Sequence, residues 1–276
     1  MTTFLIVISF IIDTIYSSKR RTIIRKASEI ESIKQTYEAF KRMPKPFVRV
    51  LPTFFLSNIA IFQYSLRFTS FMGHDIYGGI SEYDHPLKPL FDKGLMMVMR
   101  CNIVNNVVQL IYGFLNNKFV DKVGMKWVMV IGTFVMSVSF MCFFFIKEKK
   151  KSTFYCLDGL FGFSQVIFMT IPYALVSLII PTEELANNFG VLNSFLVFGQ
   201  IFSVLVQNSI VEKVIDAYGK KNLIATYDIG SACIFGFLAT LCSFFIVQPS
   251  LAEIGNYNQI KDTTETSELG CFQIDN

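Results

Sequence analysis

Four side-chain amides on one apolar segment are the groups of this chain best suited to bind a polar solute. They are Asn102, Asn105, Asn106 and Gln109. At the 100° per residue of an α-helix they fall within an arc of about 100°. A carboxamide supplies donors and an acceptor, which suits neutral solutes rich in hydroxyl groups. The alternative is that these amides hold packed helices together through interhelical hydrogen bonds.

Two other segments carry polar stripes. Asn193, Gln200 and Gln207 repeat every seven residues, and Asp158 and Gln165 share a face by the same interval. Three polar stripes are explained more simply by a shared aqueous path than by three separate helix contacts. The residues expected to line this path are Asn58, Gln63, Asn102, Asn106, Gln109, Gln165, Tyr173, Asn193 and Gln200.

Charges inside apolar segments are costly, so each needs a partner or water. Arg100 lies about two helical turns into its segment, on the face opposite the amides, and Asp158 lies about one turn into its own. They could form an ion pair at an outer gate, or each could extend separately to the headgroups. Arg67 and Lys93 lie close enough to segment ends to need no special explanation.

The elements that position these residues are six apolar segments of roughly 20 residues, the length that spans the ~30 Å hydrocarbon core. They cover residues 47–68, 93–116, 127–146, 154–180, 189–211 and 228–248. The third and sixth contain hydroxyls but no amide and no internal charge. We therefore predict an all-α integral membrane protein with a six-helix transmembrane bundle, in the plasma membrane or an organelle membrane, with the lipid bilayer as its surroundings.

The flanking segments differ in composition. Residues 1–16 resemble a partial transmembrane helix, and no basic residue precedes them as in a signal peptide. Residues 17–46 carry nine basic residues, which predicts a cytoplasmic loop, either an amphipathic surface helix or a solvated linker. Residues 249–276 are expected to form a disordered cytoplasmic tail. The lysine-rich run at residues 147–151 falls on the predicted outer side and locally opposes this orientation.

Other functional classes find little support. His74 and His85 lie in one predicted loop without a third metal ligand, and the six cysteines have no metal-ligand spacing. We find no arrangement of nucleophile and base, so we expect no enzyme activity, no metal and no cofactor. The net charge of +4 is concentrated in one loop, so nucleic acid is not an expected partner.

Four segments resemble one family in its order and spacing. Residues 68–79, FTSFMGHDIYGG, resemble the T-D-W/F-M-G-x-x-x-Y/F-x-G segment that ends helix seven of sucrose:proton symporters. Residues 171–177, IPYALVS, and 190–193, GVLN, are similar to motifs of helices ten and eleven. Residues 117–126, NKFVDKVGMK, match the loop between helices eight and nine. The family belongs to the glycoside–pentoside–hexuronide branch of the major facilitator superfamily.

The resemblance implies that the six segments are helices seven to twelve, the carboxy-terminal half of a major facilitator fold. In that superfamily helices seven, eight, ten and eleven line the path, while nine and twelve face lipid. It also places Asp121 and Gly124 in a turn at residues 117–126 that is part of the inward gate. Two departures matter: the amino-terminal bundle, with its proton-coupling acid, has no counterpart, and Ser70 replaces the family's aspartate.

We therefore expect the carboxy-terminal half of a sugar:proton symporter-like carrier that works by alternating access. Its substrate would be a small neutral sugar such as a sucrose-like glycoside, with Tyr173 stacking on a sugar face and protons as a second candidate substrate. The missing amino-terminal bundle or a second copy would complete the site. The alternative is a truncated, non-transporting membrane protein that associates with or regulates a full-length carrier.

Overall fold

The computed structural model describes Lys41 and residues 43–146, 150–180, 182–207, 209, 213 and 224–247. The predictions for residues 1–16, most of 17–46 and 249–276 therefore fall outside the described residues. The chain divides into two compact units, Met1–Met43 and Pro44–Asn276. The structure is described below for the second unit only.

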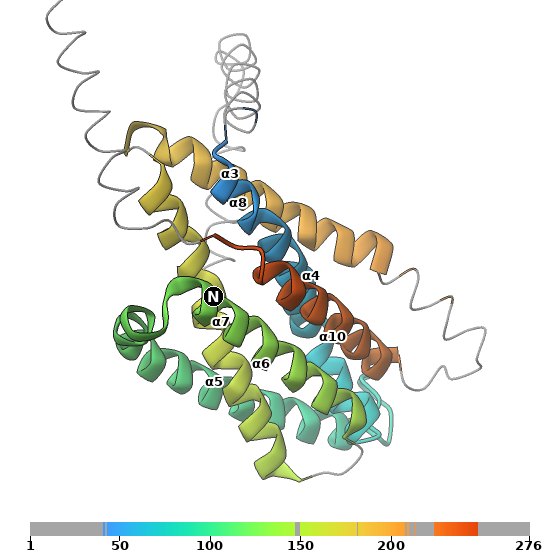
Figure 1. Cartoon of the computed structure of the whole chain (residues 1–276). Coiled ribbons are helices and arrows are strands. Elements are labelled where there is room, and N and C mark those ends of the chain that lie inside the picture. Colours follow the sequence, from blue (N-terminus) through green and yellow to red (C-terminus); the bar gives the residue numbers. More distant parts are fainter. Residues whose placement is uncertain are drawn as a thin grey trace, which may run out of the picture. The chain divides into compact units, whose positions relative to one another are not determined.

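The second unit is built of helices, and its described residues include no strand. Six helices are long and apolar enough to cross a membrane, which confirms the six predicted spans. Successive long helices run in alternate directions (Figure 1). The elements in chain order are α3 (Lys45–Val48), α4 (Val50–Ser70) with the π-helical turn η1 (Phe71–Ile76), α5 (Lys88–Val123), α6 (Met125–Phe145), α7 (Lys151–Ile179), α8 (Thr182–Phe202) with the π-helical turn η2 (Ser203–Gln207), and α10 (Ile224–Ser243).

Helix packing centres on α4, which contacts both α8 and α10. Helix α10 also packs on α6, and α7 packs on both α5 and α6. The core between these helices is aromatic. The Tyr64 ring lies 4.9 Å from Phe140, 5.3 Å from Phe143 and 4.8 Å from Phe161, measured between centroids. Such aromatic contacts add to the packing that holds membrane helices together.

Helix α5 is longer than its apolar segment predicted. It begins at Lys88 and continues through most of the predicted 117–126 turn to Val123. The reversal is confined to Gly124, whose φ of 87° is a left-handed conformation that favours glycine. At 1.5 Å per residue, 36 residues measure about 54 Å, well beyond the ~30 Å hydrocarbon core. Part of α5 must therefore project out of the hydrocarbon.

The turn η1, which follows α4, determines where α5 and α10 lie. A Cβ atom at Gly94 of α5 would lie only 2.7 Å from the Cα of Gly73 in η1, so the two backbones approach closely there. The Asp75 carboxylate accepts hydrogen bonds from the Thr226 backbone N–H at 2.7 Å and the Thr226 hydroxyl at 2.6 Å. Asp75 thus caps the amino-terminal end of α10 from another helix.

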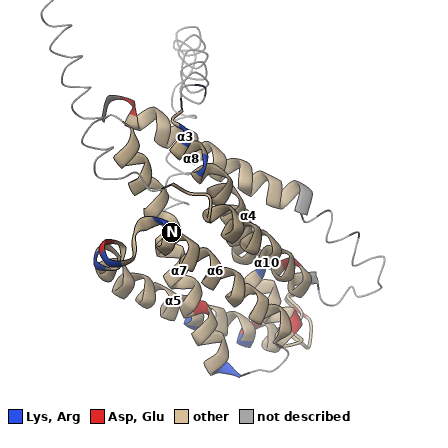
Figure 2. Ribbon diagram, in the orientation of Figure 1, with Lys and Arg blue, Asp and Glu red and all other residues tan. Residues whose placement is uncertain are grey.

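Charged residues lie mainly near helix ends (Figure 2). Among the described residues, one ion pair joins two helices: Arg67 Nε of α4 lies 2.7 Å from Asp228 Oδ2 of α10, and the Asp228 side chain is 1% exposed. This contact corrects two expectations. Arg67 has a specific partner, and the sixth span contains an internal charge because α10 begins at Ile224, before Asp228.

Candidate functional site

A polar cavity of about 300 Å³ lies between α4, α5 and α7. Its polar lining residues are Tyr64, Ser65, Thr69, Asn102, Asn105, Asn106, Gln109, Asp158 and Gln165. The face of α5 that carries the amides at positions 102–109 points to the cavity. Close packing holds α7 beside it: a Cβ atom at Gly162 would lie 2.7 Å from the backbone oxygen of Asn105.

A hydrogen-bond network crosses from α5 to α7 on one side of the cavity. Asn105 donates from Nδ2 to the backbone oxygen of Asp158 at 2.8 Å. Gln109 donates from Nε2 to Asn105 Oδ1 and, at 3.1 Å, to Gln165 Oε1. From α4, the Tyr64 hydroxyl donates to Asp158 Oδ1 at 2.7 Å. These bonds hold the Asp158 carboxyl at one end of a fixed polar wall.

Two amides of the cavity are left available for a solute. Asn102 and Asn106 are exposed, and no hydrogen bond joins either side chain to another described residue. Each therefore offers an unused carbonyl and an unused NH₂ group to the cavity. The cavity thus combines two available amides, a fixed amide network and one carboxyl.

Three other predicted path residues lie elsewhere in the structure, on α7 and α8. The Tyr173 hydroxyl of α7 donates to Asn193 Oδ1 of α8 at 2.8 Å. The Tyr173 ring also makes edge contacts with Phe54 and Phe189. Gln200 is half-buried on α8. These three residues belong to the α7–α8 side and do not line the 300 Å³ cavity.

Asn58 and Gln63 are buried where α4 packs against α8 and η2. Gln63 Oε1 accepts a hydrogen bond from the Ser203 hydroxyl of η2 at 2.7 Å. A Cβ atom at Gly199 of α8 would lie 3.3 Å from the Asn58 Cβ. For Gln63 the structure favours the alternative in which amides join packed helices. Asn58 lies at the same helix contact, but its buried amide nitrogen has no hydrogen-bond partner among the described residues.

The predicted gating residues are placed separately. Asp158 is only 1% exposed and hydrogen-bonds Tyr64, whereas Arg100 is exposed and lines a different pocket. The structure therefore contradicts the predicted Arg100–Asp158 ion pair. It also contradicts the alternative in which Asp158 extends to the headgroups, because the Asp158 carboxyl is held inside the bundle. Asp121 is exposed in the last turn of α5, next to the Gly124 reversal.

Sequence reasoning missed Tyr64 as a cavity residue. A tyrosine within an apolar segment resembles a core aromatic, and four of its ring neighbours are indeed phenylalanines. Only the tertiary contact with Asp158 reveals its polar role. Asn105 was visible in the amide stripe, but its backbone contact to α7 could not be read from one segment.

Comparison with known proteins agrees with this architecture. Residues 90–261 match the family model described as the Major Facilitator Superfamily. No curated protein matches the chain significantly. The match begins in α5 and extends past α10, so it includes most of the cavity lining. With this match and six helices long and apolar enough to cross a membrane, the chain belongs to the Major Facilitator Superfamily, a family of transporters, and is a multi-pass integral membrane protein.

Proposed function

We propose that this chain is the carboxy-terminal half of a secondary carrier that moves a neutral sucrose-like glycoside together with a proton by alternating access. The observation that carries the proposal is the polar cavity between α4, α5 and α7. Carriers of this architecture hold substrate near the midplane between two repeats, so one bundle contributes half of the site.

The amides support a neutral, hydroxyl-rich substrate. Asn102 and Asn106 can each donate to and accept from sugar hydroxyls, and Gln109 and Gln165 are held beside them by their own bond. The cavity volume of about 300 Å³ lies at the small end of the ~300–1,000 Å³ range of small-molecule sites. That size fits one half of a disaccharide site.

Asp158 supports proton coupling. Among the described residues that line the cavity, it alone carries a carboxyl group. The aspartate of the resembled helix-seven motif is Ser70 here, so Asp158 would supply the titratable group from α7 instead. Tyr64 and Asn105 would position Asp158. Tyr64 donates a hydrogen bond to the Asp158 carboxylate, and Asn105 donates one to the Asp158 backbone oxygen.

Cysteine accessibility tests the site. In a version of the chain whose native cysteines are replaced by serine, Asn102→Cys and Asn106→Cys should react with a water-soluble maleimide. Sucrose should slow both reactions severalfold, because bound sugar covers the cavity. Ile103→Cys and Val107→Cys are the matched controls, since each is the next residue on α5 and belongs to its exposed apolar face.

The controls should react poorly in a bilayer, with or without sugar. Equal reactivity at all four positions would contradict the assignment of this face of α5 to an aqueous path. If positions 102 and 106 react but no neutral glycoside slows the reaction, the result would support an aqueous path and contradict a sugar substrate. That second result would favour the non-transporting alternative, in which the protein associates with a full-length carrier.

A further inference from the structure

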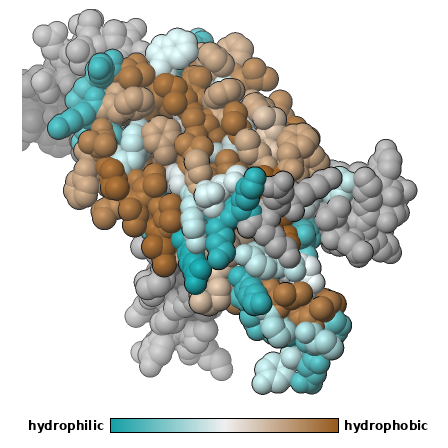
Figure 3. Space-filling model, turned by 90° about the horizontal axis from the view of Figure 1, so that it is seen from below, coloured by the Kyte–Doolittle hydropathy of each residue, from teal (hydrophilic) through white to brown (hydrophobic). Residues whose placement is uncertain are grey.

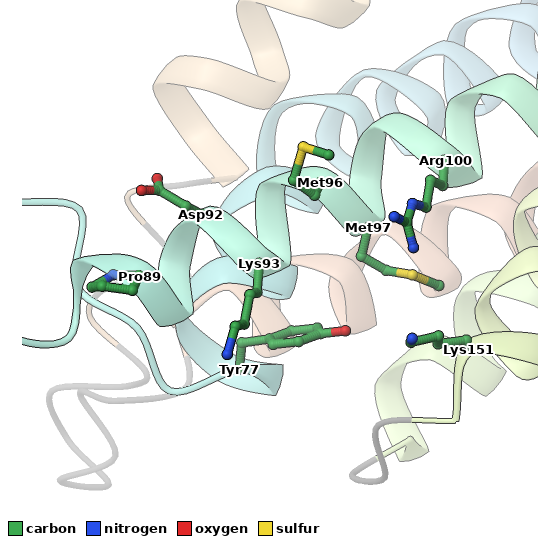
Figure 4. Close-up of a pocket in the computed structure, with 8 residues that line it drawn as sticks. All are labelled: Tyr77, Pro89, Asp92, Lys93, Met96, Met97, Arg100 and Lys151. Carbon is green, nitrogen blue, oxygen red and sulfur yellow. The ribbon is translucent and has the colours of Figure 1, made fainter.

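A second pocket, of about 580 Å³, lies at the end of the bundle where α5 and α7 begin. Three cationic side chains line it: Lys93 and Arg100 of α5 and Lys151 of α7. In Figure 4 the Arg100 guanidinium, the Lys151 ammonium and the Tyr77 hydroxyl point toward one space, and Asp92 points away from it. Lys151 belongs to the lysine-rich run that the transport path leaves unused.

The positive charge of this pocket is not balanced within the described part of the chain. There, no ion pair is formed by Lys93, Arg100 or Lys151. Asp92, the one acid among the lining residues, is already paired with Lys88. The first turn of α7 has no acidic residue, so the positive end of its helix dipole, which lies at Lys151, adds to the field. Converging cations without a counter-ion repel each other, which favours an anion between them.

The level of this pocket in the membrane follows from the helices. Lys151 is the first residue of α7, so it marks the end of that helix. Arg100 faces the same pocket although it lies 12 residues into α5, about 18 Å from its start. Arg100 therefore lies at the headgroup level, not within the hydrocarbon.

An apolar surface continues from the pocket along the same face of α5. Ile103, Val107 and Phe114 are 63%, 49% and 78% exposed, and they follow Arg100 at helical spacing toward the membrane interior. From Ile103 to Phe114 this face measures about 16 Å, close to the depth of one hydrocarbon leaflet. Hydrophilic and hydrophobic surfaces lie directly beside each other when the protein is seen from below (Figure 3).

We propose that this pocket binds the phosphate group of an anionic phospholipid, whose acyl chain lies along the exposed apolar face of α5. A guanidinium binds phosphate oxygens through two parallel N–H bonds, and the Lys151 ammonium that faces the same space adds a second positive charge. Basic pockets between transmembrane helices are suited to anionic headgroups. This site is separate from the amide-lined cavity, and it does not depend on the transported solute.

Lipid binding by the purified chain in detergent tests the proposal. Native mass spectrometry would measure the affinity for dioctanoyl phosphatidylglycerol, dioctanoyl phosphatidylcholine and inorganic phosphate. We expect the anionic lipid to bind most tightly. At about 1 kcal/mol per basic residue near a membrane surface, the double variant Arg100→Gln/Lys151→Gln should weaken it roughly 30-fold. Arg100→Lys, which keeps the charge but loses the two parallel N–H bonds, should weaken binding less than the double variant does.

The matched control is Lys118→Gln/Lys122→Gln, which removes two exposed cations from the other end of the same helix. It should leave the affinity within about twofold. Equal loss in both double variants would overturn the proposal, because the effect would then be one of net charge. Binding of phosphatidylcholine as tight as that of phosphatidylglycerol would also overturn it. So would phosphate binding as tightly as the anionic lipid, which would indicate a site for free anions.

Discussion

The sequence patterns predicted the environment of Asp158 less well than that of any other site residue. Its spacing from Gln165 placed it correctly on the polar face of α7, but its contact with Tyr64 comes from a residue 94 positions away. An isolated carboxyl inside a bundle is costly unless it is hydrogen-bonded or neutral. Tyr64 meets the first condition and a bound proton would meet the second, which is the chemistry that proton coupling uses.

Asp158→Asn tests this role directly. The amide keeps the shape and can still accept the Tyr64 hydrogen bond, but it cannot exchange a proton with the cavity. If Asp158 couples transport, an inward proton gradient should no longer drive sugar accumulation in vesicles that contain this chain together with the second bundle of the proposed carrier, while exchange of sugar for sugar continues. Asp92→Asn is the control, since that exposed carboxylate lies outside the amide cavity. Accumulation that still follows the proton gradient would exclude Asp158 as the coupling group.

Arg67 and Asp228 give a second prediction at the residue level. Replacing Arg67 by methionine removes the guanidinium that lies 2.7 Å from the Asp228 carboxylate, a side chain only 1% exposed. Removing one partner of a buried ion pair typically costs about 3–5 kcal/mol. We expect Arg67→Met to lower the midpoint of thermal unfolding in detergent markedly, and the double variant Arg67→Met/Asp228→Leu to recover most of the loss. A double variant no more stable than Arg67→Met would show that the pair matters little.

Glycines at helix crossings decide how closely the elements pack. At Gly94 a Cβ atom would meet the Gly73 backbone at 2.7 Å, which no side-chain movement can relieve, whereas at Gly113 it would meet nothing within 4 Å. Gly94→Ala should therefore destabilise the bundle by about 1–3 kcal/mol through overpacking. Gly113→Ala, on the same helix, should be neutral or stabilise it by up to about 1 kcal/mol, because alanine favours helix. Thermal unfolding of the two variants measures both effects, and equal midpoints would contradict this account of the crossing.

Hydropathy predicted the number and order of the spanning helices because their length is set by the bilayer. It predicted the ends less well. Four of the seven residues at 117–123 are polar or charged, yet the segment remains helical in α5 until Gly124 supplies the reversal. The amide stripe on α5 was correctly assigned to one face because it depends only on helical period. Whether an amide such as Gln63 faces a cavity or a neighbouring helix depends on packing, which no single segment encodes.

Burial is uneven across the bundle as a whole. The most apolar window of α4 is 67% buried, whereas those of α5 and α8 are each 28% buried. On α8 the exposed residues include Val197, Phe198 and Ile201. Helices of a two-bundle carrier that face the second bundle would show this kind of unpartnered apolar surface. In the carrier proposed above, we expect the exposed face of α8 to contact the second six-helix bundle or a second copy of this chain.

Photo-crosslinking in the membrane tests this assignment. Benzoylphenylalanine replacing Phe198, which is 62% exposed on α8, should form adducts with protein, because a second bundle would cover that face. The control replaces Phe134 on α6, which is 51% exposed and lies on a helix that the superfamily resemblance places against lipid. There the adducts should be with lipid. Lipid adducts alone at both positions would mean that the bundle stands by itself, and the half-site between α4, α5 and α7 would then face no second half.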